Sequence, residues 1–125
     1  MTLDSLADNI VINRIDSSTF AAEVKLFADL SVFDGHFPGN PILPGVAYIG
    51  IAERLAERFL GGSLELKQLK RTKFFAPSFP ENKLNISGNV TCDAENEKIV
   101  NVQVTFSNEQ MQRICLVKMI MEMLK

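Results

Sequence analysis

One stretch of the chain places an acid–base residue in a loop rich in proline and glycine. Residues 33–46 contain the only histidine, His36, with three of the five prolines and three of the seven glycines. A neutral imidazole can accept a proton near neutral pH, and proline and glycine set tight, defined turns around it. We therefore expect a rigid, buried loop that carries the chemistry of the protein.

The loop runs directly into the most regular helical segment. Pro44 has a fixed φ suited to a first helical turn, and residues 46–60 follow without a breaker until Gly61 and Gly62. The backbone N–H of Gly45 would then lie among the unsatisfied donors at the positive end of the helix dipole. Such a donor can stabilise developing negative charge, although a glycine here could also merely permit a tight turn.

The expected helix is amphipathic and should lie on a sheet. Projected at about 100° per residue, its residues separate into an apolar and a polar side. The apolar side gathers Tyr48, Ala52, Leu55, Ala56 and Phe59, and the polar side gathers Gly50, Glu53, Arg54 and Glu57.

In the remainder of the chain, apolar and polar residues alternate with the period of two that is typical of strands. Residues 9–15 and 20–28 flank a turn and predict a hairpin, and the last strand is apolar on both faces. Its methionines 119, 121 and 123 would fill gaps in the core or line a channel for an acyl tail. Strands after the helix are expected over 64–75, 84–90, 100–106 and 112–124. The pattern predicts an α+β fold and a single domain over residues 1–125.

Composition excludes several classes of function. The net charge of −2 comes from interspersed acids and bases, so we expect no nucleic-acid partner. No segment reaches the length of a membrane span and the start resembles no secretory signal, which predicts a cytoplasmic protein without a membrane partner. Cys92 and Cys115 are expected to be reduced packing thiols, and no metal site is expected.

The segment from His36 to Val46 resembles the HFPGxPxxPGV motif of the hot-dog-fold 3-hydroxyacyl-[acyl-carrier-protein] dehydratases of the FabZ and FabA type. The step Phe74-Phe75-Ala76-Pro77 also looks like the turn after that family's post-helix strand. The resemblance implies a curved antiparallel sheet of five to six strands wrapped around one long central helix. It also implies a homodimer or higher homo-oligomer with active sites at the subunit interface, a hetero-oligomer being the alternative.

The implied function is that of a (3R)-hydroxyacyl-ACP dehydratase of fatty-acid or related acyl-chain biosynthesis, a hydro-lyase that forms a trans-2-enoyl thioester. By this resemblance His36 is the base and the Gly45 N–H polarises the thioester carbonyl. The partner is an acyl carrier protein or acyl thioester, and no cofactor is expected beyond the carrier's phosphopantetheine arm. Substrate-binding residues would be Phe37, Pro38, Ile42, Pro44, Val46 and Tyr48.

The sequence departs from this family at the catalytic acid. The family has a Glu or Asp fourteen positions after the histidine, where this chain has Gly50. Glu53 is the nearest replacement, about 4.5 Å further along the helix, although it could be an ordinary charged surface residue. Two alternatives therefore stand beside the dehydratase: a non-catalytic acyl-binding or carrier-binding subunit, alone or within a heteromeric dehydratase, and an acyl thioesterase.

Overall fold

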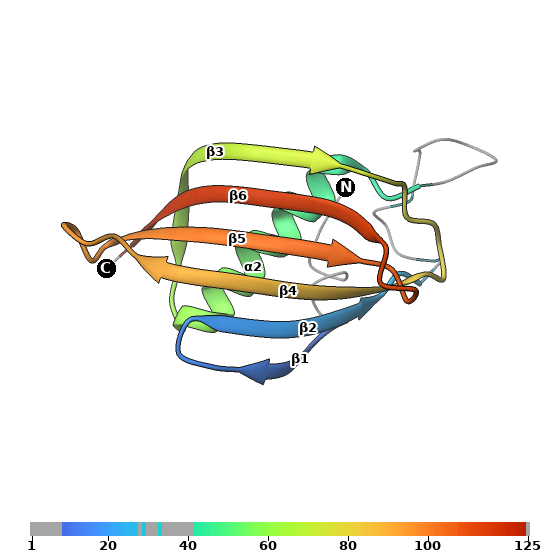
Figure 1. Ribbon diagram of the computed structural model, residues 1–125, viewed down its shortest axis with the longest axis horizontal. Helices are drawn as coiled ribbons and strands as arrows, with labels where there is room; N and C mark the ends of the chain where they lie inside the picture. The colour runs from blue at the N-terminus through green and yellow to red at the C-terminus, as the bar shows by residue number, and fades with distance from the viewer. Residues whose placement is uncertain (1–8, 28, 30–32, 34–41, 125) are drawn as a thin grey trace.

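The computed structural model describes residues 9–27, 29, 33 and 42–124. Within these residues, six strands form one antiparallel sheet and a single long helix, α2, packs against it (Figure 1). In chain order the elements are β1 (Ile10–Ile15), β2 (Thr19–Lys25), α2 (Gly45–Leu60), β3 (Leu64–Phe74), β4 (Lys83–Cys92), β5 (Ile99–Ser107) and β6 (Arg113–Met123). The predicted α+β class is confirmed.

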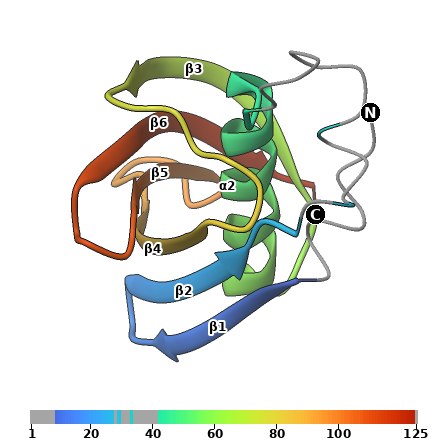
Figure 2. The same cartoon turned by 90° about the vertical axis from the view of Figure 1, so that its right-hand side faces the viewer.

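The order of the strands across the sheet is β1-β2-β4-β5-β6-β3. The expected hairpin of β1 and β2 forms at one edge, and β3 returns to the other edge to pair with β6. Figure 2 shows the sheet curving around α2, which lies along its concave side. This is the arrangement of a hot-dog fold, as predicted.

The core lies between the sheet and the helix. Alternation along the strands directs one set of side chains towards α2, because successive residues of a strand point to opposite faces. Met119 and Met121 are 1% and 0% exposed in this core, and Met123 packs against it from its margin. The methionines therefore fill the core of the chain.

Two sequence-based expectations for the thiols and the last strand need correction. Cys115 is buried, and burial raises the pKa of its thiol to about 12, but Cys92 is exposed at the end of β4 and packs into no core. The second face of β6 is only half-buried at Leu116 and Ile120, and Lys118 on that face is exposed. Only the face towards α2 is fully apolar and buried, since the opposite face of the sheet has no covering layer among the described residues.

The helix buries a wider surface than the projection predicted. Gly50, expected on the polar side with Glu53, is buried, as are Ala47 and Ile51. A curved sheet wraps around more than one side of a helix, so the apolar stripe is broader than that of a helix on a flat surface. Glu53 and Glu57 remain half-buried, while Arg54 and Arg58 are exposed.

The carboxyl end of α2 is closed by several hydrogen bonds. Gly61 adopts a left-handed conformation at φ 72°, and its N–H and that of Gly62 donate to the Glu57 carbonyl at 2.8 and 3.2 Å. The Glu57 carboxylate accepts the N–H of Leu64 at 3.0 Å, and Arg58 donates to the Ile10 carbonyl at 3.1 Å. A glycine at this position avoids the cost that a Cβ would incur in the left-handed region.

None of the helices in the described ranges is long and apolar enough to cross a bilayer.

Candidate functional site

A cavity of about 410 Å³ lies at the amino end of α2. One wall is the segment that enters the helix, and the other is the end of β3 with the turn that follows it. The first wall comprises Ile42, Leu43, Gly45 and Tyr48, and the second comprises Phe74, Phe75, Ala76 and Pro77. The lining is largely apolar, which suits an acyl chain or another apolar group.

Gly45 is the residue of this cavity that could act on a bound carbonyl. It is the first residue of α2, so its N–H belongs to the donors that have no acceptor within the helix. Pro44 precedes it in an extended conformation, and none of the described side chains caps this end. A polarised N–H at the positive end of a helix, on the wall of an apolar cavity, can stabilise negative charge on an oxygen.

The close approach of Phe74 explains why residue 45 has no side chain. A Cβ built on Gly45 would lie 2.8 Å from Cζ of the Phe74 ring, well inside van der Waals contact. The ring therefore covers the position where any side chain at residue 45 would begin. This packing joins the helix start to the end of β3 and leaves the backbone of Gly45 on the cavity wall.

Tyr48 and Ser78 fasten the two walls of the cavity together. The Tyr48 hydroxyl donates to Oγ of Ser78 at 2.7 Å, and the Ser78 carbonyl accepts the N–H of Leu43 at 2.8 Å. Tyr48 and Ser78 are 2% and 1% exposed, and burial raises the pKa of Tyr48 to about 12, against the opposing effect of the bond to Ser78. Tyr48 is thus a neutral hydrogen-bond donor that holds the wall in place.

Phe75 stands at the rim of the cavity between two cations. Its ring is 40% exposed, with Lys73 Nζ 5.3 Å and Arg113 Cζ 4.8 Å from the ring centroid. Both distances are within the range of cation–π attraction. The apolar cavity therefore has a positively charged margin.

The structure brings together some of the residues that the sequence singled out. Ile42, Gly45 and Tyr48 line the cavity. Pro44 is half-buried at the helix start, whereas Val46 is 58% exposed and is not among the described residues that line the cavity. The remaining predicted residues, His36, Phe37 and Pro38, lie outside the described residues.

Glu53 is not brought to this cavity within one chain. It lies eight residues after Gly45, which is about 12 Å along the helix axis. The carboxyl is half-buried, and its pKa is raised, first by burial and then by the charge of Glu57, while Arg54 opposes the shift. A carboxyl that holds its proton to higher pH is suited to donate that proton. Because Glu53 lies away from the cavity of its own chain, the group that accepts the proton must lie outside that cavity.

The second wall was not predicted as part of the site. Phe74, Phe75 and Pro77 line the cavity and Ser78 anchors it, yet only the resemblance of the step at 74–77 drew attention to this segment. The available signal was two adjacent aromatic residues followed by prolines, which end the strand because proline cannot donate to the ladder, so that Phe74 is the last residue of β3.

In the described part of the chain, no three His, Cys, Asp or Glu side chains are placed to share a metal ion.

A family model matches most of the chain. Residues 12–117 match the family described as ApeI-like, ApeI dehydratase. This match runs from β1 to β6 and includes both walls of the cavity.

Curated relatives match over shorter stretches. A 3-hydroxyacyl-[acyl-carrier-protein] dehydratase FabZ of Enterococcus faecalis is 36% identical over 76 residues, covering 60% of this chain and 48% of the relative. The FabZ of Latilactobacillus sakei is 52% identical over 46 residues, covering 36% and 31%. The chain thus spans less than half of the length of these relatives.

Solved structures share the fold. A chain of the dehydratase heterocomplex ApeI:P from Xenorhabdus doucetiae is 23% identical, with a TM-score of 0.74, covering 90% of this chain and 94% of that one. A hypothetical thioesterase protein with coenzyme A from Streptococcus pneumoniae is 15% identical, with a TM-score of 0.75, covering 96% and 89%. At these identities the likeness concerns the fold, which hosts more than one chemistry.

Proposed function

The chain belongs to the ApeI-like dehydratase family, and on that premise we propose that it removes water from 3-hydroxyacyl thioesters to give trans-2-enoyl thioesters. Residues 1–125 would act as one hot-dog domain in the cytoplasm. The observation that carries the proposal is the start of α2 at Gly45, which has no cap from the described side chains and lies on the wall of an apolar cavity.

The elimination needs a base, an oxyanion donor and an acid. His36 takes the proton from the carbon next to the thioester carbonyl, and the Gly45 N–H stabilises the negative charge that develops on the carbonyl oxygen. The departing hydroxyl takes a proton from an acid and leaves as water. Ile42, Pro44 and Tyr48, with Phe37 and Pro38, bind the substrate around the thioester and the first carbons of its chain, whereas the exposed Val46 lies outside the cavity.

Glu53 is the acid that this chain can offer. Its raised pKa supports the assignment, because the shift increases the fraction of the carboxyl that holds a proton to donate. Its distance from Gly45 along α2 requires that it serve the cavity of a second subunit. The active unit is therefore a dimer or higher oligomer in which the acid of each chain serves the cavity of another chain. The substrate arrives on the phosphopantetheine arm of an acyl carrier protein.

Turnover assays test this function. Purified protein is incubated with 3-hydroxyacyl thioesters of several chain lengths, and the enoyl product is followed by its absorbance. Wild-type protein should form the enoyl product, and His36→Ala should lower kcat about 100-fold or more. Unchanged turnover in His36→Ala would remove the assigned base. Release of free thiol without enoyl product would identify a thioesterase.

A second candidate is a non-catalytic or heteromeric subunit, favoured by Gly50. This residue is buried in α2 and offers no carboxyl at the family's acid position. Here the chain would bind the acyl thioester and rely on a different subunit for the acid. The variant Gly50→Glu separates the two candidates: a gain of turnover in the isolated protein favours the incomplete site, whereas a loss, with Glu53→Gln also inactive, favours Glu53 as the acid.

A further inference from the structure

The outer face of the sheet, turned away from α2, carries an uncharged surface on its two central strands. Strands β4 and β5 are third and fourth in the order of the sheet. We call their eight outward residues the neutral patch, and they form four cross-strand pairs: Asn85 with Ser107, Ser87 with Thr105, Asn89 with Gln103, and Thr91 with Asn101. None of the eight is charged, although 22% of the chain is Asp, Glu, Lys or Arg. Charged side chains are mostly exposed, so their absence here is unexpected for a surface that meets only water.

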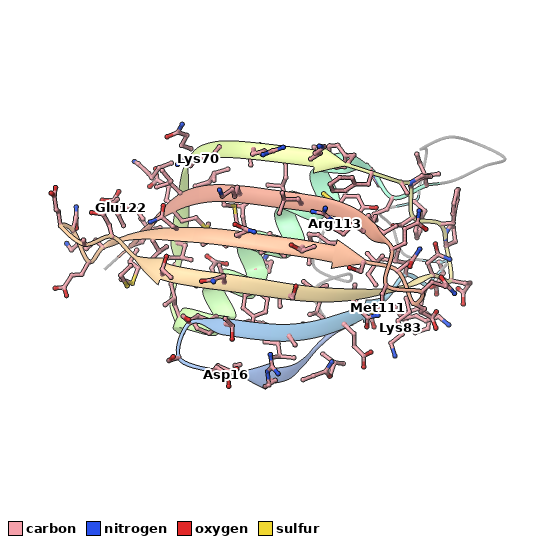
Figure 3. The ribbon with its side chains drawn as sticks, viewed as in Figure 1. Asp16, Lys70, Lys83, Met111, Arg113 and Glu122 are labelled. Atoms are coloured by element: carbon pink, nitrogen blue, oxygen red, sulfur yellow. The ribbon has the colours of Figure 1, made fainter. Side chains whose placement is uncertain are left out.

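Charged side chains begin at the margins of the neutral patch. Lys118 of β6 lies opposite Gln103, and Glu23 of β2 lies opposite Asn85. Figure 3 looks onto the outer face and labels charged residues at its margins, away from the middle of β4 and β5: Asp16, Lys70, Lys83 and Glu122. An uncharged centre inside a charged rim is the composition that distinguishes protein interfaces from the rest of a protein surface.

Small and apolar side chains extend the neutral patch on both sides. On β6, the half-buried Leu116 and Ile120 face outward beside β5. On β2, the half-buried Thr19 and Ala21 face outward beside β4. These residues add apolar area to a surface that otherwise consists of hydroxyls and amides, and removal of that area from water favours association.

The shape of the sheet limits what can rest on this face. Figure 2 shows the sheet curving around α2, so the outer face is convex and its crest runs along the central strands. Two shallow hollows of about 340 and 290 Å³ lie on this crest, and both are lined by Asn89 and Gln103. Sites for small ligands are concave clefts, which a convex face does not provide. A second convex face can touch the first along the crest, where the neutral patch lies.

The chemistry of the neutral patch is complementary to itself. Hydroxyl and amide groups both donate and accept hydrogen bonds, so a second copy of the surface supplies the partners that the first copy needs. In the part of the chain that the structure describes, the side-chain amides of Asn89, Asn101 and Gln103 form no hydrogen bond. A two-fold axis brings identical surfaces together, and surfaces of like charge related in that way would repel each other.

We propose that the neutral patch is an interface between two copies of this chain, which pack back to back through the convex faces of their sheets. The inference does not depend on the proposed function. The patch is on the opposite face of the sheet from α2, so the cavity at the amino end of the helix stays open in the assembly. Because neither edge of the sheet takes part, a dimer joined along an edge would become a tetramer.

Charge placed on the neutral patch tests the proposal. Asn89→Lys and Thr105→Lys each put a cation on the patch, and Gln110→Lys makes the same kind of change in the exposed turn between β5 and β6 as a control. Sedimentation equilibrium measures the mass of the assembly, and circular dichroism checks that each variant is folded. Wild-type protein and Gln110→Lys should have about twice the mass of the two patch variants, because a two-fold interface holds two copies of each added charge.

A mixing experiment separates back-to-back packing from contact with a different surface. Asn89→Glu alone should also have about half of the wild-type mass, whereas an equimolar mixture of Asn89→Lys and Asn89→Glu should regain the wild-type mass, because opposite charges then meet in one interface. Equal masses of wild type and the patch variants would overturn the proposal. A mixture that stays dissociated would also overturn it, as would an equal loss of mass in Gln110→Lys.

Discussion

The two ends of helix α2 differ in how their backbone groups are satisfied. At the carboxyl end, Gly61 and Gly62 donate to the Glu57 carbonyl, and the Glu57 carboxylate accepts the N–H of Leu64. At the amino end, Pro44 provides no side-chain cap, and Gly45 lies on the wall of a cavity. The closed end contributes to stability, whereas the open end keeps a polarised donor available for a ligand. The difference separates the functional end of the helix from the structural one.

The variant Gly45→Ala changes the open end of α2 and is expected to have the largest effect of the variants described here. The new methyl group would meet the Phe74 ring at 2.8 Å, and the backbone N–H would move from its place on the cavity wall. We expect kcat to fall about 100-fold, as for the loss of one oxyanion donor. Because the ring is 53% exposed, it takes up part of the clash and the backbone takes up the rest, so urea unfolding should show a loss of about 1 kcal/mol, the low end for an overpacked site.

A matched control for this prediction is Gly62→Ala in the turn after the helix. A Cβ on Gly62 meets nothing within 4 Å, so both activity and stability should stay close to wild type. If the two alanine variants had equal activity, the amino end would not be the functional end.

The variant Ser78→Ala tests how strongly the open end depends on its anchor. It leaves the buried Tyr48 hydroxyl without its acceptor, which should cost about 1–3 kcal/mol in the free energy of unfolding. The double variant Tyr48→Phe with Ser78→Ala removes both partners and should recover part of that loss. Denaturant unfolding of the single and double variants measures the coupling, and strict additivity of the two losses would contradict a link between the walls.

The variant Gly61→Ala tests the closed end. An alanine at φ 72° enters the left-handed region, which should cost about 1–2 kcal/mol of stability. Turnover should remain at the wild-type level, because the change lies at the far end of α2 from the cavity. A parallel loss of activity and stability would show that the ends are not separate.

The variant Glu53→Gln, between the two ends, should have the smallest effect on stability. Because the folded pKa of Glu53 is raised, the folded state binds its proton more tightly than the unfolded state. The resulting stabilisation is present below the usual glutamate pKa and is lost as pH rises through the folded pKa. As pH rises through this range, the free energy of unfolding of Glu53→Gln should therefore fall less, or rise more, than that of wild type, and an identical pH dependence would contradict the shift.

The fold was predictable because its signals are local and repeated. Alternation from Leu84 to Val90 and from Val100 to Phe106 predicted strands β4 and β5, and Gly61 marked the end of the helix. What the sequence could not predict depends on pairing between distant segments. The bond from Tyr48 to Ser78 joins α2 to the segment after β3, and the convergence of Lys73 and Arg113 on Phe75 arises because β3 lies beside β6.

The candidate site was predictable on one wall only. The motif located Ile42 and Gly45, and the helical projection placed Tyr48 on the apolar side of the helix; all three line the cavity. Burial of Gly50 was missed, because a helical projection assumes one covered side while the curved sheet covers more.

The placement of β3 at the sheet edge also has a consequence for the order of folding. Leu64 at the start of β3 pairs with Met123 at the end of β6. Strand β3, which directly follows α2 in the chain, can therefore pair only when β6, the last strand, is also in place. Such non-local pairing slows folding, because the ordering of a long intervening chain precedes the gain in contacts. The cavity needs Phe74 and Phe75 from β3 and its turn. Ligand-binding competence should therefore emerge late, as the final contacts close the sheet.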